Sequence, residues 1–399
     1  MQPQSDPFDL AIVGGGLVGT SLACALEPYG LRVALVEAAE SAQAVSGFDQ
    51  RKLALSKLSL EALDAFGVLG RLRQRPTAIE RIHVSRTGDF GRVLLNAVDF
   101  GHAAFGGVVL AQELGHALSE QVAALKNTRR FCPASLAGCS LDGAVAELRL
   151  QTADGPQRIH ARWVAAADGT QSFIRGALGI GTQEHDYRQT AFVCSLQAEK
   201  ASEGTAYERF SEQGPVALLP MADGQYGSIC GVASEQKESV SRLSDAGYAD
   251  YLQQRFGWRV GKIQRVGNRS HYPLRRVLAE RIAAKRCVLL GNAAQTIHPI
   301  GAQGFNLGLR DALGFAALVR QYGIEDGLAG RYAQDRAEDR ERTLAFSDGL
   351  AKLTSNPGLP MHALRSLALS GLGIMPHLAA PMVSSAMGMR QPDLLDVIG

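Results

Sequence analysis

The start of the chain carries an apolar run, a group of glycines and a second apolar run. Residues 8–13 read FDLAIV, which indicates a buried strand, and three glycines follow at once. Residues 17–29 have apolar side chains at helical spacing up to Gly30, which is typical of a helix end. A second strand is predicted at residues 32–36, and Glu37 follows it. This order predicts a strand–turn–helix–strand unit that ends in an acidic residue.

The rest of the pattern separates helical segments from strand-rich ones. Helical spacing predicts helices over residues 52–74, 109–126, 244–256, 303–322 and 327–353. Alternation and short apolar runs predict strands at 79–86 and 92–98, a hairpin of 142–151 and 157–167, a strand-rich region at 183–270 and a short buried strand at 287–290.

We therefore expect an α/β fold with an N-terminal Rossmann-like βαβ unit, an inserted and mostly antiparallel sheet domain, and C-terminal helices. The expected domains are a discontinuous nucleotide-binding domain at 1–75, 100–180 and 271–345, a substrate-binding sheet domain at 76–99 and 181–270, and a helical segment at 346–399.

Composition excludes several classes of protein. Among 399 residues, 41 Lys and Arg and 39 Asp and Glu are interspersed, which argues against nucleic-acid binding. A hydrophobic fraction of 46% argues against disorder. The six cysteines form no Cys-x-x-Cys pair, so neither a metal site nor a disulfide framework is expected. The polar N-terminal residues MQPQSDPFDL lack a signal-peptide pattern, and we expect a cytoplasmic protein.

The first glycine cluster has the spacing of a dinucleotide-binding turn. Gly14-x-Gly16-x-x-Gly19 follows the first predicted strand and opens the first predicted helix. In such a motif the first glycine makes the tight turn, the second lets the backbone approach a pyrophosphate, and the third lets helix and strand pack closely. Glu37 stands where a carboxylate accepts hydrogen bonds from ribose hydroxyls.

The number of such motifs bears on which dinucleotide is bound. A reductase of the two-dinucleotide type would carry a second Gly-x-Gly-x-x-Gly in mid-chain, and the sequence has none. The single unit at the N-terminus favours a tightly held FAD. NAD(P)H or another electron donor would then act as a co-substrate without a Rossmann site of its own.

Two further segments carry polar residues and glycines after predicted strands. Asp168 and Gly169 follow the strand of 157–167, where the simplest alternative is an ordinary turn. Gly291 follows the short strand of 287–290 and begins a glycine-rich loop that reaches Gly308. A helix starts within this loop, so its N–H groups would face the flavin edge that gains negative charge on reduction.

The motifs together resemble a known family. In this order they are similar to the flavin-dependent aromatic hydroxylases of the p-hydroxybenzoate hydroxylase fold. The segment from Phe48 to Ser56 resembles that family's D-x-R-x-x-A-L stretch, whose arginine is here Arg51. The stretches GNAAQTIHPI, QGFNLGLRDA, YERFSEQGPVALLPMADG and FGWRVGKI resemble the 2-polyprenyl-6-methoxyphenol hydroxylases of ubiquinone biosynthesis. The resemblance covers residues from about 8 to 390.

The resemblance implies a set of FAD-contacting residues. Asn292 stands where the wider family has Asp, and it implies a hydrogen bond to a ribityl hydroxyl. The expected cofactor-binding residues are Gly14, Gly16, Gly19, Glu37, Arg51, Asp168, Gly169, Asn292, Gly301, Gly304 and Asn306. No residue is assigned to catalysis. His298 and Pro299 are candidates near the flavin, and the alternative for His298 is a structural role.

The reaction that the resemblance implies is FAD-dependent hydroxylation of a prenylated phenol. Dioxygen would add at flavin C4a to give a hydroperoxide, which transfers one oxygen atom to the ring. One alternative is a related monooxygenase acting on a soluble phenol. Another is a non-catalytic FAD-binding subunit of a biosynthetic complex. Expected partners are the phenol, dioxygen and subunits of a quinone-biosynthesis complex, with no nucleic acid, and the chain can form an oligomer.

Some residues carry weaker expectations. Residues 366–389 contain no charged side chain and are rich in methionine, including Met382 and Met387. We expect part of this segment to contact a membrane peripherally at its inner face, a partner subunit or the prenyl chain, and the alternative is packing on the enzyme body or at a homodimer interface. His83 is expected to be solvated. Tyr207 and Phe210 either line the substrate cavity or fill the core of the sheet.

Overall fold

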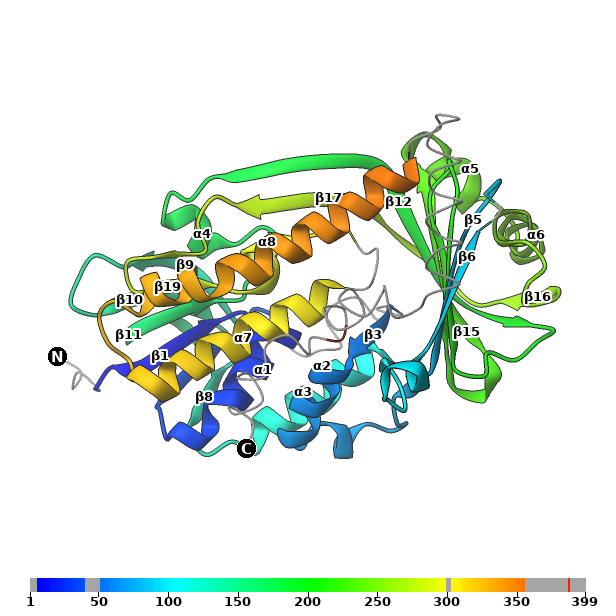
Figure 1. Cartoon of the computed structure of the whole chain (residues 1–399). Helices are drawn as coiled ribbons and strands as arrows, with labels where there is room; N and C mark the ends of the chain where they lie inside the picture. Colours follow the sequence, from blue (N-terminus) through cyan, green and yellow to red (C-terminus); the bar gives the residue numbers. More distant parts are fainter. Residues whose placement is uncertain (1–5, 40–50, 90, 299–302, 356–386, 388–399) are drawn as a thin grey trace.

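The computed structural model describes residues 6–39, 51–89, 91–298, 303–355 and 387, and of residues 346–355 it describes the backbone alone. The described chain forms three sheets, of eight, nine and three strands. The eight-stranded sheet lies at one end of the molecule with α1, α7 and α8, and the nine-stranded sheet lies at the other end with α6 (Figure 1). The expected α/β fold is confirmed.

The eight-stranded sheet is built around the N-terminal strand. Its strands are β1 (Phe8–Val13), β2 (Val33–Val36), β8 (Thr128–Phe131), β9 (Ala134–Ser140), β10 (Ala146–Thr152), β11 (Gly155–Ala166), β18 (Ala283–Ala284) and β19 (Cys287–Leu289). The central order β19-β11-β1-β2-β8 is parallel throughout, and β9 and β10 extend β11 in antiparallel fashion. The predicted hairpin is therefore confirmed. Continuous apolar runs such as FDLAIV suit strands of a parallel sheet that is covered on both faces.

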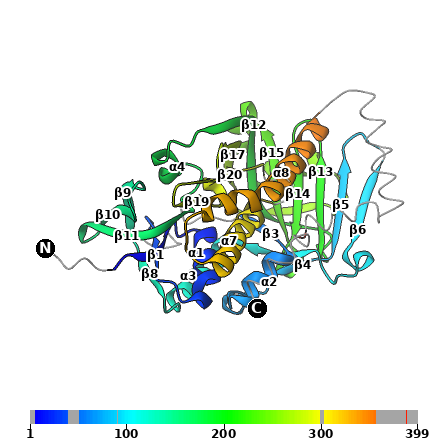
Figure 2. The same ribbon diagram turned by 60° about the vertical axis from the view of Figure 1, so that its left-hand side comes forward.

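The nine-stranded sheet is mostly antiparallel, as expected. Its strands are β5 (Arg81–Arg86), β6 (Arg92–Asn96), β12 (Thr182–Ala198), β13 (Thr205–Phe210), β14 (Val216–Pro220), β15 (Tyr226–Ala233), β16 (Ile263–Val266), β17 (Ser270–Ala279) and β20 (Gln295–Thr296). Only the β5–β13 pair is parallel among these described strands. The long strands β12 and β17 run from this sheet towards the eight-stranded one (Figures 1 and 2).

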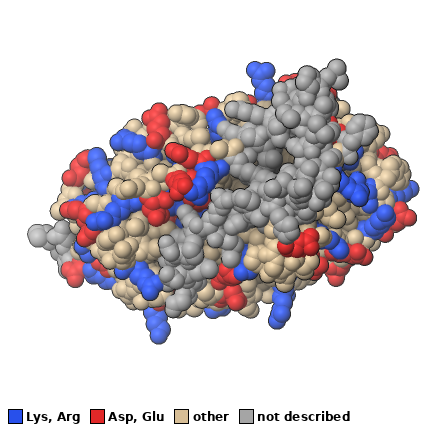
Figure 3. All heavy atoms as spheres, in the orientation of Figure 1, with Lys and Arg blue, Asp and Glu red and all other residues tan. Residues whose placement is uncertain are grey.

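The helices cover the sheets. They are α1 (Leu17–Leu26), α2 (Lys57–Ala65), α3 (Ala111–Ala123), α4 (Phe173–Ala177), α5 (Lys237–Ser241), α6 (Asp245–Phe256), α7 (Gln303–Tyr322) and α8 (Leu328–Ser355). Helices α1, α3 and α7 share one apolar core with the eight-stranded sheet, whereas α6 packs on a second core with β12, β14 and β15. Within the described residues, no helix is both long enough and apolar enough to cross a membrane. Acidic and basic side chains are interspersed on the face shown in Figure 3.

Two local expectations are wrong. The helix predicted over 52–74 begins later, because residues 52–56 form the strand β3 and pair with β7 (Gly106–Leu110), which also pairs with β4 (Thr77–Ile79). His83 is 5% exposed rather than solvated, and its ring lies 5.5 Å from that of Tyr207. Burial, with a smaller contribution from Arg259, lowers the pKa of His83 to about 4.

The expected contact surface near the C-terminus is also corrected at one residue. Met387 is 2% exposed and belongs to an apolar cluster with Ile79, Val93 and Val108. Its carbonyl oxygen accepts a hydrogen bond from the Leu58 amide at 3.3 Å. Met387 is therefore a core residue and cannot contact a membrane. The other residues of 366–389 lie outside the described residues.

Candidate functional site

The first glycine turn joins β1 to α1 and leaves open space. A Cβ atom at Gly14, where φ is +103°, would lie 2.4 Å from the carbonyl oxygen of Ala167, and one at Gly19 would lie 1.9 Å from that of Gly14. Glycine at these positions therefore lets the turn pack against its neighbours. Among the described residues, a Cβ at Gly16 would meet no heavy atom within 4 Å, and Gly16, the N-cap residue of α1, has no side chain to cap the helix. The uncapped N–H groups of α1 thus face open space at Gly16, which is suited to an anion.

Glu37 lies beside this turn. One of its carboxylate oxygens accepts a hydrogen bond from the Gly15 amide at 2.6 Å, and the other accepts one from the Ala39 amide at 2.8 Å. Each carboxylate oxygen has two lone-pair directions, so both can accept a further donor. A Cβ at Gly15 would lie 2.8 Å from the Glu37 Cβ, so this glycine is needed for the contact. The sequence motif did not single out Gly15, although it is the middle of three consecutive glycines.

Asp168 follows β11, the neighbour of β1 in the sheet. Its Oδ2 accepts a hydrogen bond from the Ile174 amide at 3.2 Å, and its Oδ1 is buried without a hydrogen-bond partner among the described residues. Gly169 has φ of +83°, and a Cβ there would meet no heavy atom within 4 Å. An unpartnered carboxylate oxygen beside open space has the geometry of a group that awaits a ligand donor.

The carboxyl ends of three parallel strands bring these residues together. Val13 at the end of β1 pairs with Val36 of β2 and with Ala166 of β11. The glycine turn, Glu37 and Asp168 each follow one of these strands. A doubly wound sheet binds its ligand at this edge.

The turn η6 (Gly291–Ala293) lies against the start of α1. A Cβ at Gly291 would lie 3.0 Å from Cγ2 of Val18, and one at Gly308 would lie 2.7 Å from the same atom. Asn292 is exposed on this turn. A Cβ at Gly304, near the start of α7, would meet no heavy atom of the described residues within 4 Å. The turn and the start of α7 therefore lie next to the glycine turn of α1.

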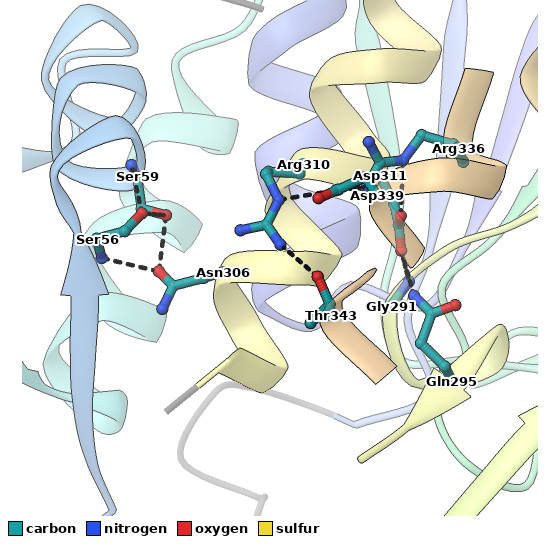
Figure 4. A network of polar contacts seen from close by, with 10 residues as sticks. All are labelled: Ser56, Ser59, Gly291, Gln295, Asn306, Arg310, Asp311, Arg336, Asp339 and Thr343. Atoms are coloured by element: carbon teal, nitrogen blue, oxygen red, sulfur yellow. Dashed lines mark hydrogen bonds and ion pairs between the residues drawn. The ribbon is translucent and has the colours of Figure 1, made fainter. Parts of the chain in front are cut away.

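A buried network of charges holds η6 in place (Figure 4). Asp311 accepts hydrogen bonds from the Gly291 amide at 3.1 Å, from Gln295 Nε2 at 2.6 Å and from Arg336 Nε at 3.0 Å. Arg336 also donates to Asp339 at 2.5 Å, and Arg310 donates to the same carboxylate at 2.9 Å. Although burial lowers the pKa of Arg336, the carboxylates of Asp311 and Asp339 raise it above its usual value. Sequence reasoning missed this network, because its members are far apart along the chain.

The side chain of Asn306 bonds to neighbouring segments of the chain, and its direct contact with the cofactor stays a prediction. It is 3% exposed, and its Oδ1 accepts hydrogen bonds from the Ser56 amide at 2.9 Å and from Ser59 Oγ at 2.8 Å. Its Nδ2 donates to the Ala54 carbonyl oxygen at 2.9 Å. These bonds tie the start of α7 to the junction of β3 and α2 (Figure 4). The side chain of Asn306 therefore holds the start of α7 in place.

Of the remaining candidate site residues, the structure describes some and not others. Arg51 is exposed and directly precedes β3. Pro299 and Gly301 lie outside the described residues. His298 is 2% exposed. Its ring and the ring of Tyr187 pack edge to face, with centroids 4.7 Å apart. Among the described residues, no group of His, Cys, Asp and Glu is arranged to hold a metal ion.

A pocket opens on the face of the nine-stranded sheet opposite α6. It is lined by Ala191, Glu208, Ala217, Ile229, Leu274 and His298 among others. Neither aromatic candidate lines it, because Tyr207 packs against Phe256 with ring centroids 5.7 Å apart and Phe210 is 5% exposed. Glu208 was not predicted as a site residue from the sequence. Its only signal there is an acidic residue at a position of β13 whose neighbours across the sheet are apolar.

The described residues fit a dinucleotide that extends from the glycine turn towards this pocket. Open space at Gly16, uncapped amides of α1 and the unpartnered oxygen of Asp168 lie at one strand edge. The segment after β19 carries Asn292 beside this edge and His298 in the pocket wall. One short segment thus joins the two halves of the site.

Comparison with known proteins gives a consistent result. The family model described as FAD binding domain matches residues 8–346. The chain is 32% identical over 389 residues to ubiquinone hydroxylase UbiL of Rhodospirillum rubrum, covering 95% of this chain and 89% of the relative. It is 28% identical over 373 residues to 3-demethoxyubiquinol 3-hydroxylase of Escherichia coli K12, covering 92% and 94%.

Among solved structures, the fold is similar to that of p-nitrophenol 4-monooxygenase PnpA from Pseudomonas putida. The TM-score is 0.78 at 18% identity, covering 97% of this chain and 98% of the other.

Proposed function

As a member of the FAD binding domain family, the chain is a FAD-dependent monooxygenase, and we propose that it hydroxylates the ring of a prenylated phenol in ubiquinone biosynthesis. The observation that carries this proposal is the continuity of the site. The segment from Asn292 to His298 leads from the strand edge suited to a dinucleotide to a largely apolar pocket. The names of the two curated relatives support the substrate class.

The chain's own residues would bind and orient the cofactor. The open turn at Gly16 and the amides of α1 would receive the pyrophosphate, and Glu37 would accept bonds from ribose hydroxyls. Asp168 would offer its unpartnered oxygen, and Asn292 its exposed amide, to the remaining polar groups. When bound, FAD supplies the activation of dioxygen with electrons from NAD(P)H or another donor, through the C4a route expected above.

The pocket residues would bind the ring and exclude water. Ala191, Ala217, Ile229 and Leu274 present apolar surface to it, and His298 closes the wall nearest the cofactor segment. We include in the proposal the two-domain division expected from the sequence. We also include a peripheral membrane contact, or a quinone-biosynthesis complex, as the route by which a lipid-soluble phenol reaches the pocket.

Cofactor binding is tested by Gly16→Val. Gly16 has φ of −71°, which a β-branched residue adopts readily, so the variant should fold. Its side chain would fill the space in front of α1, and we expect the flavin absorbance of the purified protein to disappear. Gly330→Val is the matched control, because a Cβ there also meets no heavy atom within 4 Å and the site lies on α8. A Gly16→Val protein that keeps its full FAD content contradicts the assignment of the turn.

The reaction is tested with ¹⁸O₂ and two phenols, one prenylated and one with a short chain. We expect one labelled oxygen atom in the product, a dependence on an electron donor and faster turnover of the prenylated phenol. Cells that lack the gene should accumulate a 6-methoxyphenol precursor. Equal turnover of both phenols would favour a soluble substrate, and an FAD-bound protein that forms no product would indicate a scaffold subunit.

A further inference from the structure

Glu208 is the acidic side chain of the pocket wall. It lies in the middle of β13, opposite Ala217 of β14 and Val84 of β5. Its side chain is half-buried, and it forms no hydrogen bond or ion pair with another residue of the described chain. Strand alternation places the adjacent Tyr207 on the other face of the sheet, where it packs against Phe256.

Within the part of the chain that the structure describes, the strands that border the pocket present apolar side chains around Glu208. Burial raises its pKa from 4.5 to about 7, and no charged neighbour contributes to that shift. Among the described residues that line the pocket, the other titratable group is His298. The remaining lining residues are Ala191 from β12, Pro215 and Ala217 from the β14 region, Ile229 and Gly231 from β15, and Leu274 from β17.

A purely structural role does not explain this carboxyl group. A buried charge that stabilises a fold is paired, as Asp311 is with Arg336, whereas an unpaired one costs free energy. A titratable group in a pocket beside a cofactor segment, with its pKa moved towards neutrality, is typical of a group that exchanges a proton with a ligand. The pocket that we assign to the phenol ring offers one carboxylate to the ring's hydroxyl group.

We propose that Glu208 accepts the proton of the substrate's phenol hydroxyl group. The inference rests on the proposed function. The O–H bond of the phenol breaks, its electron pair stays on the oxygen, and the proton goes to a carboxylate oxygen of Glu208. The phenolate is the more electron-rich ring for oxygen transfer. After oxygen transfer the phenolate oxygen has become a ring carbonyl oxygen. The ring carbon that gained oxygen then loses its proton to water, the C–H electron pair makes the ring aromatic again, and Glu208 returns its proton to the oxygen, which is a phenolate oxygen once more.

The first test is binding without turnover. The probe is 2-methoxyphenol, which stays neutral between pH 5 and about 8.5, and its binding is followed by the change in the absorbance of oxidised FAD with no electron donor present. We expect the dissociation constant of the wild type to fall about tenfold as the pH rises through about 7, because the ionised carboxylate accepts the phenol's hydrogen bond. In Glu208→Gln this pH dependence should vanish.

The controls separate this role from others. Glu212→Gln removes an exposed carboxylate just after the same strand, and it should bind the probe as the wild type does. His298→Asn should keep the pH dependence. If the dependence survives in Glu208→Gln, or disappears only in His298→Asn, the proposal is overturned.

The second test is turnover. We expect Glu208→Gln to lower kcat on the order of 10²-fold or more with normal FAD content, and Glu208→Asp to recover part of it with an acid limb in the pH profile. An unchanged rate and pH profile in Glu208→Gln would overturn the proposal while leaving the hydroxylase function intact. A wild type that binds FAD but neither binds nor hydroxylates any phenol would instead contradict the proposed function.

Discussion

The buried charges between α7 and α8 are paired, whereas two charged groups nearer the nine-stranded sheet, Glu208 and Lys52, are not. Arg336 is 0% exposed and contacts two carboxylates, and Asp311 accepts three hydrogen bonds. Glu208, on β13 of the nine-stranded sheet, has no polar partner in the described chain, and Nζ of Lys52, on β3 of the three-stranded sheet, is buried without a hydrogen-bond partner there. The paired region fixes the η6 turn beside α1. The unpaired Glu208 lines the pocket, where its charge can change with pH.

The cost of an unpaired charge follows from its surroundings. The stem of Lys52 packs on β15, where a Cβ at Gly227 would lie 2.6 Å from the Lys52 Cγ. Burial lowers the pKa of Lys52 and raises that of Glu208. Both shifts oppose the charged form, because neither group has an ion partner to compensate for lost hydration. The difference between the regions can be tested by removing one charge from each.

The largest effect is expected for Arg336→Met. It leaves Asp311 buried without its cationic partner, and removing one member of a buried pair costs about 3–5 kcal/mol. Urea unfolding should show this loss, and FAD content should fall because η6 is released. Glu338→Gln on the same helix breaks only an exposed ion pair with Arg342 and should cost less than about 0.5 kcal/mol. Similar losses in both variants would remove the distinction between paired and surface charges.

The second effect is a gain of stability in Glu208→Gln that depends on pH. The folded-state pKa of about 7 lies above the ordinary value of 4.5, so the group is neutral in both states below pH 4.5. Between pH 4.5 and about 7 the unfolded state is ionised while the folded state still holds the proton, so the wild type loses stability across this range until the buried carboxyl also ionises. The variant should be more stable at pH 8, by at most about 3 kcal/mol, and equal at pH 4. Thermal melts at both pH values check the sign, and an advantage that persists at pH 4 contradicts it.

The sequence predicted those parts of the site that are local in the chain. The glycine turn, Glu37 and Asp168 each follow a predicted strand, and parallel pairing alone brings them to one edge. The helix predicted at 303–322 is α7, because its apolar spacing is long and regular. The strand at 52–56 was missed, because its residues form helices well in isolation and become a strand only by pairing with β7.

Contacts between residues that are distant along the chain could not be predicted from the sequence. The bonds of Asn306 to Ser56 and Ser59 cross most of the chain, so its positioning role could not be read from the motif. The faces occupied by His83 and Glu208 depend on the parallel pairing of β5 with β13, for which no local turn gives a signal. The same limit hid the Arg336–Asp311 pair.

The third effect is expected for Lys52→Met. The folded-state pKa of Lys52 lies below its ordinary value, so its buried ammonium group destabilises the folded protein at neutral pH. The wild type therefore gains stability as the pH rises towards 10.5. Methionine fills similar volume without charge, so the variant should be more stable by about 1–2 kcal/mol at pH 7. The advantage should shrink at pH 10. A destabilised variant would mean that Lys52 has a partner when FAD is bound, which repeating the measurement on the FAD-free protein would reveal.

The smallest effect is expected for Asn292→Leu, and it separates positioning from binding. Asn292 is exposed on the turn that the network fixes, so its replacement should leave the free energy of unfolding of the FAD-free protein unchanged. If its amide bonds the cofactor, the substitution leaves a polar group of FAD unpaired, and FAD affinity should fall about tenfold in a fluorescence titration. Asn292→Asp keeps an acceptor and should bind nearly as the wild type does. Arg336→Met should lose both stability and affinity, whereas Asn292→Leu should lose affinity alone. If Asn292→Leu binds FAD with wild-type affinity, η6 positions backbone rather than side-chain groups towards the cofactor.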